Sequence, residues 1–448
     1  MLIVFVIKPA RRKRFFADPY NMASKSLIPL LLALLVVVTV AEAINNYYGY
    51  KVITVQAKTD EQVKAIRELE KLENVNFWKE PNIHTTTDIC VPPRHINRVK
   101  LTLMSLGLEP KITVENVQLL IFEAIAANSV ARFEASSFRS GVSKQARVKK
   151  YFLRLVEIDA WMKQLAAENP SLIKVWSIGQ SHEGRHTLAM RIGDGTKPGI
   201  FIDAGIHARE WLAVSTALYL INELVDGLKT GKTTDLLAKY DWYFVPVVNP
   251  DGYEYTHTNK RMWRKNRRPM SYCVGADPNR NFDINFGGAG TSSQSCQDTY
   301  HGTSAFSEPC ARNLAVLLMG LSQKNRLVAY MSLHAYAQMW FTPFAYSRWA
   351  RPDDIDELTR VAKIGARAIY NTNGKSYTVG SPANILYEAA GSSMDWVKAK
   401  TNIKYAFAME MRPSMGSRNG FIVPPSEIVP AGEEMFAGIT AMAAAMRR

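Results

Sequence analysis

The fold is decided by the stretch GIFIDAGIHARE (residues 199–210), in which an apolar run is followed by His207 and Glu210. A second apolar run, residues 327–333, is followed in the same way by His334. Runs of this length are typical of buried parallel strands, and the ligands of open α/β sheets lie beyond the carboxyl ends of such strands. The sequence therefore predicts that two imidazoles and one carboxylate meet at one edge of a sheet. With a water molecule, this is the ligand set of an open, catalytic zinc site.

Helical and strand-like patterns alternate around these two runs, from residue 151 to residue 448. Helical spacing covers residues 156–168, 212–228, 310–322, 356–371 and 433–446, and further apolar strand-like runs lie at 172–178, 187–192, 242–248 and 405–410. Such alternation predicts an α/β fold with a mixed, mostly parallel sheet and helices on both faces. Residues 251–306 are rich in Gly, Ser, Asn and Tyr, and we expect a long loop region that carries function.

A smaller α+β unit is predicted before this region, within residues 47–135. Strand-like runs lie at 50–55, 75–78, 87–91 and 111–114, and helical spacing lies at 60–72, 97–106 and 117–130. Residues 136–150 follow with five basic residues and no acidic one. An exposed basic linker between two domains is a preferred site of proteolysis, and we favour this interpretation over an ordinary solvated linker.

The first 43 residues have the features of a secretory signal peptide. The apolar run at residues 27–40 is followed by Ala41-Glu42-Ala43, a small-x-small cleavage pattern. At about 14 residues the run is shorter than the roughly 20 that a membrane anchor needs. Residues before Met22 form an upstream extension, and the sequence leaves open whether translation starts at Met1 or at Met22.

Composition supports a large globular protein with no nucleic-acid or membrane partner. Hydrophobic residues make up 47% of the 448 residues, which excludes a disordered chain. Of the net charge of +15, +9 lies in residues 1–150, in segments that we expect to be removed. The basic excess therefore indicates targeting and cleavage rather than a nucleic-acid surface.

Six motifs within residues 207–412 resemble those of zinc metallocarboxypeptidases of the carboxypeptidase A and B type. They are His207-Ala208-Arg209-Glu210-Trp211, Arg261-Met262-Trp263-Arg264-Lys265, Asp277-Pro278-Asn279-Arg280-Asn281, Ser332-Leu333-His334-Ala335-Tyr336, Ile385-Leu386-Tyr387 and Met409-Glu410-Met411-Arg412. Residues 76–81, Asn-Phe-Trp-Lys-Glu-Pro, resemble the family's activation domain, so the resemblance extends from about Tyr47 to Arg448. It implies the zinc carboxypeptidase fold, a ferredoxin-like prosegment at 47–135, an activation linker at 136–150 and a catalytic domain at 151–448.

The resemblance also implies a monomeric secreted zymogen that acts in digestion and binds one zinc ion per chain. Its ligands would be His207, Glu210 and His334, with Asp277 orienting His207 through the second ring nitrogen. Peptide hydrolysis needs a group that takes a proton from water, and Glu410 at the end of the run 405–409 is the expected general base. The alternative for Glu410 is a buried carboxylate paired with the nearby Arg412.

Arginine side chains would account for an activity that acts at peptide C-termini, because they can bind the free carboxylate of the substrate. A free carboxylate is held best by a guanidinium fork with further donors, and the resemblance gives this role to Asn279, Arg280 and Tyr387. Arg264 would polarise the scissile carbonyl, although a basic loop at 261–268 is the alternative. Further substrate contacts are implied for Arg209 and Tyr336.

In the resembled family one residue of the specificity pocket separates the subtypes, and counting from Tyr387 places that position at Met394. An aspartate there would select Lys and Arg, whereas a thioether favours aliphatic or aromatic side chains. We therefore expect A-type specificity. Ser392 and Ala345 stand where the family often has glycine, which favours aliphatic residues. A one-residue misalignment would make Asp395 the selector and the enzyme B-type.

Four cysteines leave three full pairings open. The resemblance implies a Cys273–Cys296 disulfide, which a secreted protein can form. Cys90 and Cys310 are expected to be buried free thiols, and a bond between them is the alternative. The Trp/Tyr-His pair that the family has at the start of the enzyme is replaced here by Lys150-Tyr151-Phe152-Leu153. The residue at which the mature enzyme begins therefore stays open within 139–151.

Two other functions fit the residues less well. Residues 179–184, Gly-Gln-Ser-His-Glu-Gly, resemble the nucleophile elbow of a serine hydrolase, but the second glycine lies one position too far from the serine. The other is a secreted binding protein with a catalytically inactive carboxypeptidase fold. Such a protein would be expected to lose a zinc ligand or the base, but His207, Glu210, His334 and Glu410 are all present. Peptide and protein C-termini and an activating trypsin-like protease are therefore the expected partners.

Overall fold

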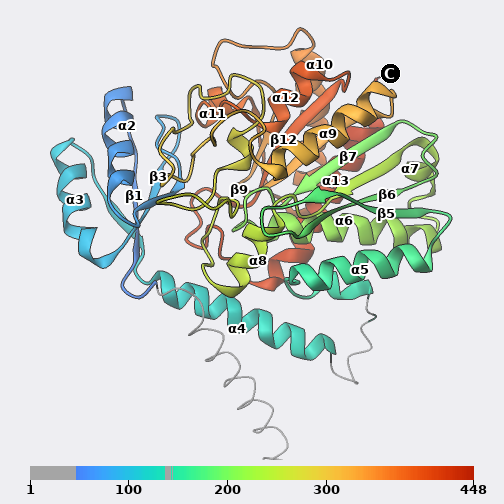
Figure 1. Ribbon diagram of the computed structural model, residues 1–448, viewed down its shortest axis with the longest axis horizontal. Coiled ribbons are helices and arrows are strands. Elements are labelled where there is room, and N and C mark those ends of the chain that lie inside the picture. The colour runs from blue at the N-terminus through green and yellow to red at the C-terminus, as the bar shows by residue number, and fades with distance from the viewer. Residues whose placement is uncertain (1–46, 137–142, 144, 448) are drawn as a thin grey trace, which may run out of the picture.

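A computed structural model describes residues 47–136, 143 and 145–447 of the chain (Figure 1). The predicted extension and signal peptide lie outside the described residues, as does much of the basic linker. None of the helices in the described ranges is long and apolar enough to cross a membrane.

The N-terminal unit, residues 47–136, is the small α+β domain that the sequence predicts. Its sheet has the order β2-β3-β1-β4, and neighbouring strands are antiparallel. The elements are β1 (Lys51–Val55), α2 (Asp60–Arg67), β2 (Asn76–Lys79), β3 (Thr87–Val91), α3 (Ile96–Ser105) and β4 (Lys111–Val114), with short 3₁₀ turns at Glu68–Lys71 and Pro93–His95. Ile53, Ile66, Phe77, Ile89 and Leu103 are buried together between this sheet and its helices.

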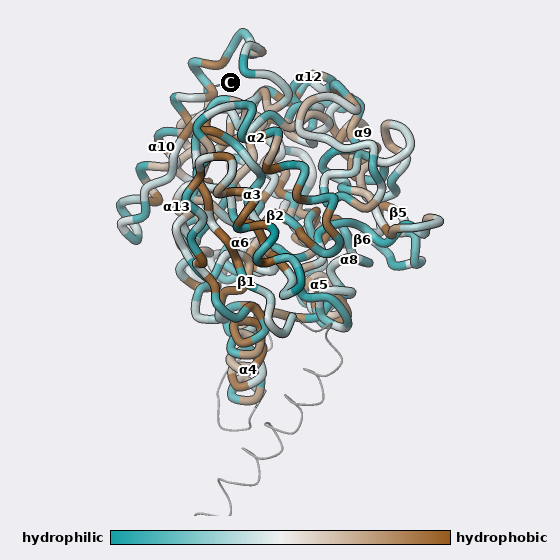
Figure 2. The backbone as a smooth tube through the Cα atoms, turned by 90° about the vertical axis from the view of Figure 1, so that its left-hand side faces the viewer, coloured by the Kyte–Doolittle hydropathy of each residue, from teal (hydrophilic) through white to brown (hydrophobic). Residues whose placement is uncertain are grey.

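A long helix, α4 (Val117–Ser136), connects the N-terminal unit to the rest of the protein. It runs beneath both parts in Figure 1, and Figure 2 shows hydrophobic residues along much of its length. Ile121 and Ile125 are buried, whereas Phe133 is 54% exposed. The linker then forms a 3₁₀ turn, η3 (Gln145–Lys149), whose Val148 is fully buried, so the end of the linker is packed rather than solvated.

The C-terminal unit, residues 145–447, is built on one eight-stranded sheet of order β11-β10-β12-β9-β7-β8-β6-β5. Parallel pairs join β7 to β8 and β9, β9 to β12, and β10 to β11, while β5–β6, β6–β8 and β10–β12 are antiparallel. The strands are β5 (Ile173–Gln180), β6 (His186–Ile192), β7 (Gly199–Ala204), β8 (Asp241–Val245), β9 (Leu327–Ala337), β10 (Met339–Phe341), β11 (Thr378–Gly380) and β12 (Tyr405–Ser414). The expected mixed, mostly parallel sheet is confirmed.

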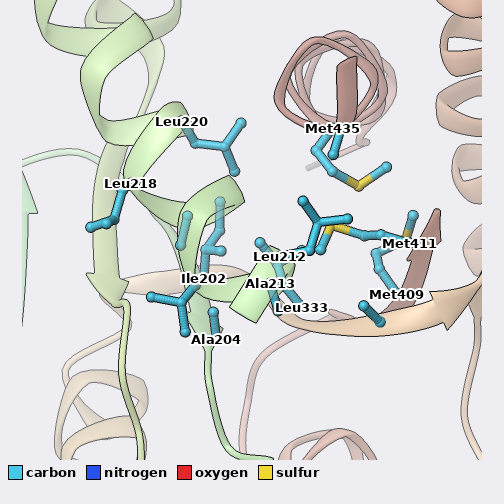
Figure 3. Packing of buried hydrophobic residues seen from close by; sticks show 14 of the residues in the cluster. Ile202, Ala204, Leu212, Ala213, Leu218, Leu220, Leu333, Met409, Met411 and Met435 are labelled. Carbon is cyan, nitrogen blue, oxygen red and sulfur yellow. The ribbon is translucent and has the colours of Figure 1, made fainter. Parts of the chain in front are cut away.

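Both faces of this sheet are buried, which is why its central strands are continuously apolar. Side chains alternate along β7, so Ile202 packs with α6 while Phe201 packs on the opposite face. Figure 3 shows the core on the face of Ile202, where Leu212 and Met435 pack with side chains of the sheet. Helices of that face are α5 (Leu155–Glu168), α6 (Trp211–Lys229), α10 (Ile355–Asn373) and α13 (Ile428–Ala445), and those of the other are α9 (Pro309–Gln323) and α12 (Ser393–Lys400).

Several boundaries differ from the sequence prediction. β9 and β12 continue past His334 and Glu410, because residues beyond both pair with each other as far as Ala337 and Ser414. α13 begins five residues before the predicted start, with Pro430 in its first turn, where a proline is tolerated. Elements that the sequence patterns did not predict are β10, β11, α7 (Thr234–Lys239), α8 (Pro250–Thr258), α11 (Pro382–Ile385) and α12.

Candidate active site

His207, Glu210 and His334 converge at the carboxyl edge of the sheet. His207 and Glu210 lie in the turn between β7 and α6, and His334 lies in β9 beside the end of β7. One ligand atom from each residue lies within 4.8 Å of the other two, and all three residues are buried. His207 Nδ1 is 2.9 Å from Glu210 Oε1 and 3.2 Å from His334 Nδ1, which is 3.1 Å from Glu210 Oε2.

The second ring nitrogen of His207 has a different partner, Asp277. Nε2 of His207 is 3.1 Å from Asp277 Oδ1, so the other nitrogen of this ring faces Glu210. Asp277 Oδ2 also accepts hydrogen bonds from Arg264 Nε at 3.1 Å and Nη2 at 2.8 Å. Burial opposes ionisation of Asp277, but Arg264 and His207 outweigh it and lower its pKa well below the usual value. Asp277 therefore fixes both His207 and Arg264.

These three residues fit a zinc ion. Two imidazole nitrogens and a carboxylate are the donor set of a catalytic zinc site. Tetrahedral ligands at about 2.0–2.2 Å from zinc lie roughly 3.2–3.6 Å apart. The donor atoms of His207, Glu210 and His334 are already 2.9–3.2 Å apart, so only a small expansion is needed.

Glu410 lies in β12, directly opposite His334 in the parallel pairing with β9. Its Oε2 atom is buried and has no hydrogen-bond partner. Burial, and then the charge of Glu210, raise the pKa of Glu410 to about 8. The alternative pairing with Arg412 is wrong, because Arg412 instead contacts Glu427 at 3.2 Å and Glu434 at 3.6 Å. Glu410 thus places a carboxyl group with an unpartnered Oε2 atom beside the three convergent residues.

A cavity of about 60 Å³ joins the polar residues to an apolar pocket. The polar part of its lining includes His207, Arg264, Asn279, Arg280, His334, Tyr387 and Glu410, and the apolar part includes Phe341, Ala345, Leu386, Ala389, Met394 and Ala408. Arg280 is held by hydrogen bonds to the carbonyl oxygens of Gly290 (2.9 Å) and Asn279 (3.0 Å). Asn279 accepts the backbone N–H of Ser393 at 2.9 Å, which ties this loop to the start of α12.

The start of α12 also separates Met394 from Asp395. Ser392 caps the helix by accepting the backbone N–H of Asp395. Met394 lines the cavity. Asp395 is fully buried, and its oxygens accept the backbone N–H groups of Ala345 (2.8 and 2.9 Å) and Tyr346 (3.1 Å). Burial raises the pKa of Asp395 to about 7. Asp395 therefore anchors a loop and does not line the pocket.

Arg209 and Tyr336 contact the N-terminal unit instead of open solvent. Arg209 Nη2 donates to the carbonyl oxygen of Phe77 at 3.1 Å, and the Tyr336 hydroxyl donates to Asp88 Oδ2 at 3.1 Å. Lys79 forms a buried ion pair with Asp88 at 2.9 Å. The N-terminal unit therefore lies over the outer side of the cleft. Sequence patterns could not reveal the contacts of Arg209 and Tyr336, because their partners are more than 100 residues away in the sequence.

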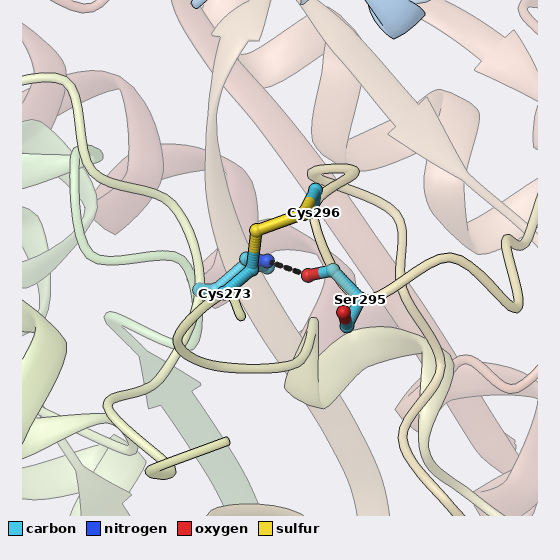
Figure 4. The surroundings of a disulfide bond; sticks show 4 residues. Cys273, Ser295 and Cys296 are labelled. Atoms are coloured by element: carbon cyan, nitrogen blue, oxygen red, sulfur yellow. Dashed lines mark hydrogen bonds between the residues drawn. A yellow bond between two sulfur atoms is a disulfide. The ribbon is translucent and has the colours of Figure 1, made fainter. Parts of the chain in front are cut away.

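The long loop between α8 and α9 is closed by the expected disulfide. Cys273 and Cys296 are bonded with a Cα–Cα distance of 5.1 Å (Figure 4). The carbonyl oxygen of the adjoining Ser295 accepts a hydrogen bond from Lys265 Nζ at 2.6 Å. Cys90 and Cys310 are buried free thiols, so the alternative bond between them is wrong.

Comparisons with known proteins agree with this geometry. The profile of the zinc carboxypeptidase family matches residues 158–438, and that of the carboxypeptidase activation peptide matches residues 53–123. Carboxypeptidase A2 of Mus musculus is 37% identical over 423 residues, which cover 92% of this chain and 97% of that protein. Carboxypeptidase B of Astacus astacus is 39% identical over 292 residues, 64% of this chain and 94% of that protein. The crystal structure of carboxypeptidase A from Helicoverpa armigera superposes with a TM-score of 0.80 at 30% identity, covering 89% of this chain and 98% of that one.

Proposed function

This chain belongs to the zinc carboxypeptidase family, with an activation peptide before the enzyme, and from that membership we propose that it releases single apolar residues from the C-termini of peptides. We further propose that it is secreted as a monomeric zymogen and acts in digestion. The observation that carries the proposal is Glu410, which lies opposite His334 in the sheet and whose buried Oε2 atom has no hydrogen-bond partner.

One zinc ion per chain is assigned to His207, Glu210 and His334. A bound zinc ion polarises a peptide carbonyl and makes water a stronger acid. Glu410 takes the proton of the attacking water on its unpartnered Oε2 and later gives it to the leaving nitrogen. Arg264, held in place by Asp277, faces the same cavity and stabilises the negative charge that develops on the carbonyl oxygen.

The polar end of the cavity fits a substrate carboxylate. Arg280 is fixed by two backbone carbonyl oxygens, so its guanidinium is preorganised before substrate arrives. Asn279 and Tyr387 line the same space and supply further donors. Once the N-terminal unit has left, Arg209 and Tyr336 become available to the part of the substrate that precedes the last residue.

The apolar end of the cavity supports A-type specificity. Met394 is 2% exposed, and among the described residues that line the cavity Glu410 is the only carboxylate. A lysine or arginine side chain would lose its hydration there without gaining a counter-charge. The side chains of Ala345 and Ser392 also line the pocket, which favours aliphatic over large aromatic residues.

The position of the N-terminal unit supports a zymogen. Its contacts to Arg209 and Tyr336 occupy side chains that we assign to the substrate. We propose cleavage by a trypsin-like protease between Arg139 and Lys150. Val148 is buried and Lys149 pairs with Glu223, so cuts before these residues are favoured.

The proposed reaction is tested by separating the base from the ligands. In the trypsin-treated protein we expect Glu410→Gln to keep one zinc ion per chain and to lose about 10²–10⁴ in kcat, the usual scale for loss of a general base. His334→Ala, in contrast, is expected to lose the zinc itself. Zinc is measured by atomic emission, and turnover with a blocked dipeptide that ends in Leu. Wild-type turnover in Glu410→Gln would refute the base, and full zinc in His334→Ala would refute the ligand set.

The proposed activation is tested by moving the cleavage site. We expect a variant with glutamine at positions 139 and 144 to stay uncut and inactive after brief trypsin treatment, because the remaining basic residues of the linker lie in or beside the packed turn η3. The control carries glutamine at 149 and 150 and should activate as the wild type does. Full activity of the untreated chain towards a small substrate would show that the N-terminal unit does not inhibit.

A further inference from the structure

Two polar residues lie inside the central strands and belong to none of the roles described so far. Asp203 of β7 and Ser332 of β9 are both 0% exposed. They are directly paired in the parallel register of these strands, so their side chains lie on the same face of the sheet. Ser332 Oγ donates to Asp203 Oδ1 at 2.7 Å. His334 follows Ser332 by two residues on that face, and its Nε2 is 3.1 Å from Ser332 Oγ.

The Asp203 carboxylate sets the direction of the hydrogen bonds that link Asp203, Ser332 and His334. An ionised carboxylate can only accept, so the proton of the Ser332 hydroxyl points to Asp203. The hydroxyl oxygen is then left with lone pairs, which accept the N–H of the His334 ring at Nε2. His334 therefore carries its proton on Nε2 and has a lone pair on Nδ1. Nδ1 is the atom that faces Glu210 at 3.1 Å and the ring of His207 at 3.2 Å.

We propose that Asp203 and Ser332 are positioning residues for zinc, which act through His334 by fixing its tautomer and the direction of its ring. This inference rests on the proposed function, because it takes His334 as a ligand. It gives each histidine its own support: His207 is held directly by Asp277, and His334 is held by Asp203 through a hydroxyl group. Burying the carboxylate of Asp203 costs free energy even with the hydroxyl groups of Ser332 and Tyr330 beside it, and zinc binding explains why a carboxylate stands there.

The test is the zinc affinity of the full chain, measured by competition with a chelating dye. We expect Ser332→Ala to weaken zinc binding by about 10–100-fold, the range for loss of an outer partner of a metal ligand. Asp203→Asn is expected to weaken it at least as much, because an amide that donates to Ser332 turns the hydroxyl proton towards Nε2 and favours the wrong tautomer. The matched control is Ser215→Ala in α6. This variant also removes a buried hydroxyl group, but one that has no hydrogen-bond partner, so zinc affinity should stay within twofold of the wild type.

A purely structural role for Ser332 is separated by a spectroscopic readout. The visible spectrum of the cobalt-substituted protein reports the ligand field, and we expect it to change in Ser332→Ala but not in Ser215→Ala. Ser332→Cys, similar in size but with a weak acceptor, is the second variant if Ser332→Ala does not fold. Wild-type zinc affinity and an unchanged cobalt spectrum in any folded variant of Ser332 would overturn the relay. If His334→Ala still loses zinc in that case, the proposed function stands; if the wild type binds no zinc, both fail.

Discussion

Replacing Met394 by aspartate is expected to reverse the specificity of the enzyme. Met394 is 2% exposed and lines the apolar end of the cavity, in the first turn of α12. Its side chain therefore faces the last residue of the substrate in our assignment. A carboxylate at this position replaces an apolar wall by a buried charge that lacks a partner until a cationic side chain enters.

The size of the effect follows from the two interactions that change. An aliphatic side chain that is buried against Met394 gains about 1.5–3 kcal/mol, much of which Met394→Asp removes. An arginine side chain gains about 1.5–3 kcal/mol from hydrogen bonds to a charged partner. The preference for Leu over Arg therefore falls by about 3–6 kcal/mol, which is roughly 10²–10⁴ in the ratio of kcat/KM at about 1.4 kcal/mol per factor of ten.

The assay compares kcat/KM for matched blocked dipeptides that end in Leu, Phe and Arg, after removal of the N-terminal unit. Met394→Leu is the control, since it keeps an apolar side chain of similar volume and should cost less than about 1.5 kcal/mol. Asp395→Asn is the second control, and we expect it to lower stability without a change of preference, because Asp395 holds the backbone at Ala345 and Tyr346. A wild type that prefers Arg, or an unchanged Leu-to-Arg ratio in Met394→Asp, would refute the assignment of the pocket.

Two further predictions concern the interface and the disulfide. Glu70 of the N-terminal unit accepts the backbone N–H of Asp298 at 3.0 Å, and burial, followed by the charges of Glu80 and Asp298, raises its pKa to about 8. Because the docked pKa exceeds the usual value, docking is strongest at low pH and weakens as the pH rises from the usual glutamate pKa to about 8, above which both states are ionised and no further change is expected. Dissociation of the nicked N-terminal unit between pH 6 and 9 measures this, and a profile that Glu70→Gln does not flatten would contradict it. Replacing both Cys273 and Cys296 by serine is expected to lower the free energy of unfolding by about 3 kcal/mol, as urea denaturation would show; a loss below about 1 kcal/mol would contradict the loop-entropy argument.

The central strands could be predicted because burial on both faces makes their sequences continuously apolar. β7 and β9 were found in this way, and the histidines that follow their apolar runs located the edge of the sheet. β10 and β11 were missed because three residues are too few to show a period. α8 was missed for another reason: its buried residues include Gly252 and Thr256, which give no apolar stripe.

The residues that converge at the site could be predicted from motifs, but the residues that support them could not. A motif names residues that are close in sequence, such as His207 and Glu210. The relay to His334 depends on the register of β7 against β9, which brings Asp203 and Ser332 together across 129 residues. Even so, a signal was present, since Asp203 is the one charged residue in the apolar run 199–206. A buried charge inside a strand requires a partner, and the search for that partner leads to Ser332.

The convergent residues are placed by the sheet and not by the N-terminal unit. β12, β9 and β7 are adjacent in that order, so Glu410, His334 and the turn that carries His207 are fixed by strand pairing. The N-terminal unit instead contacts Arg209 and Tyr336 at the outer side of the cleft. Since His207, Glu210 and His334 already converge beneath the docked unit, we infer that it inhibits by covering the cleft and not by distorting the ligands. Activation then requires only that the covering unit leave.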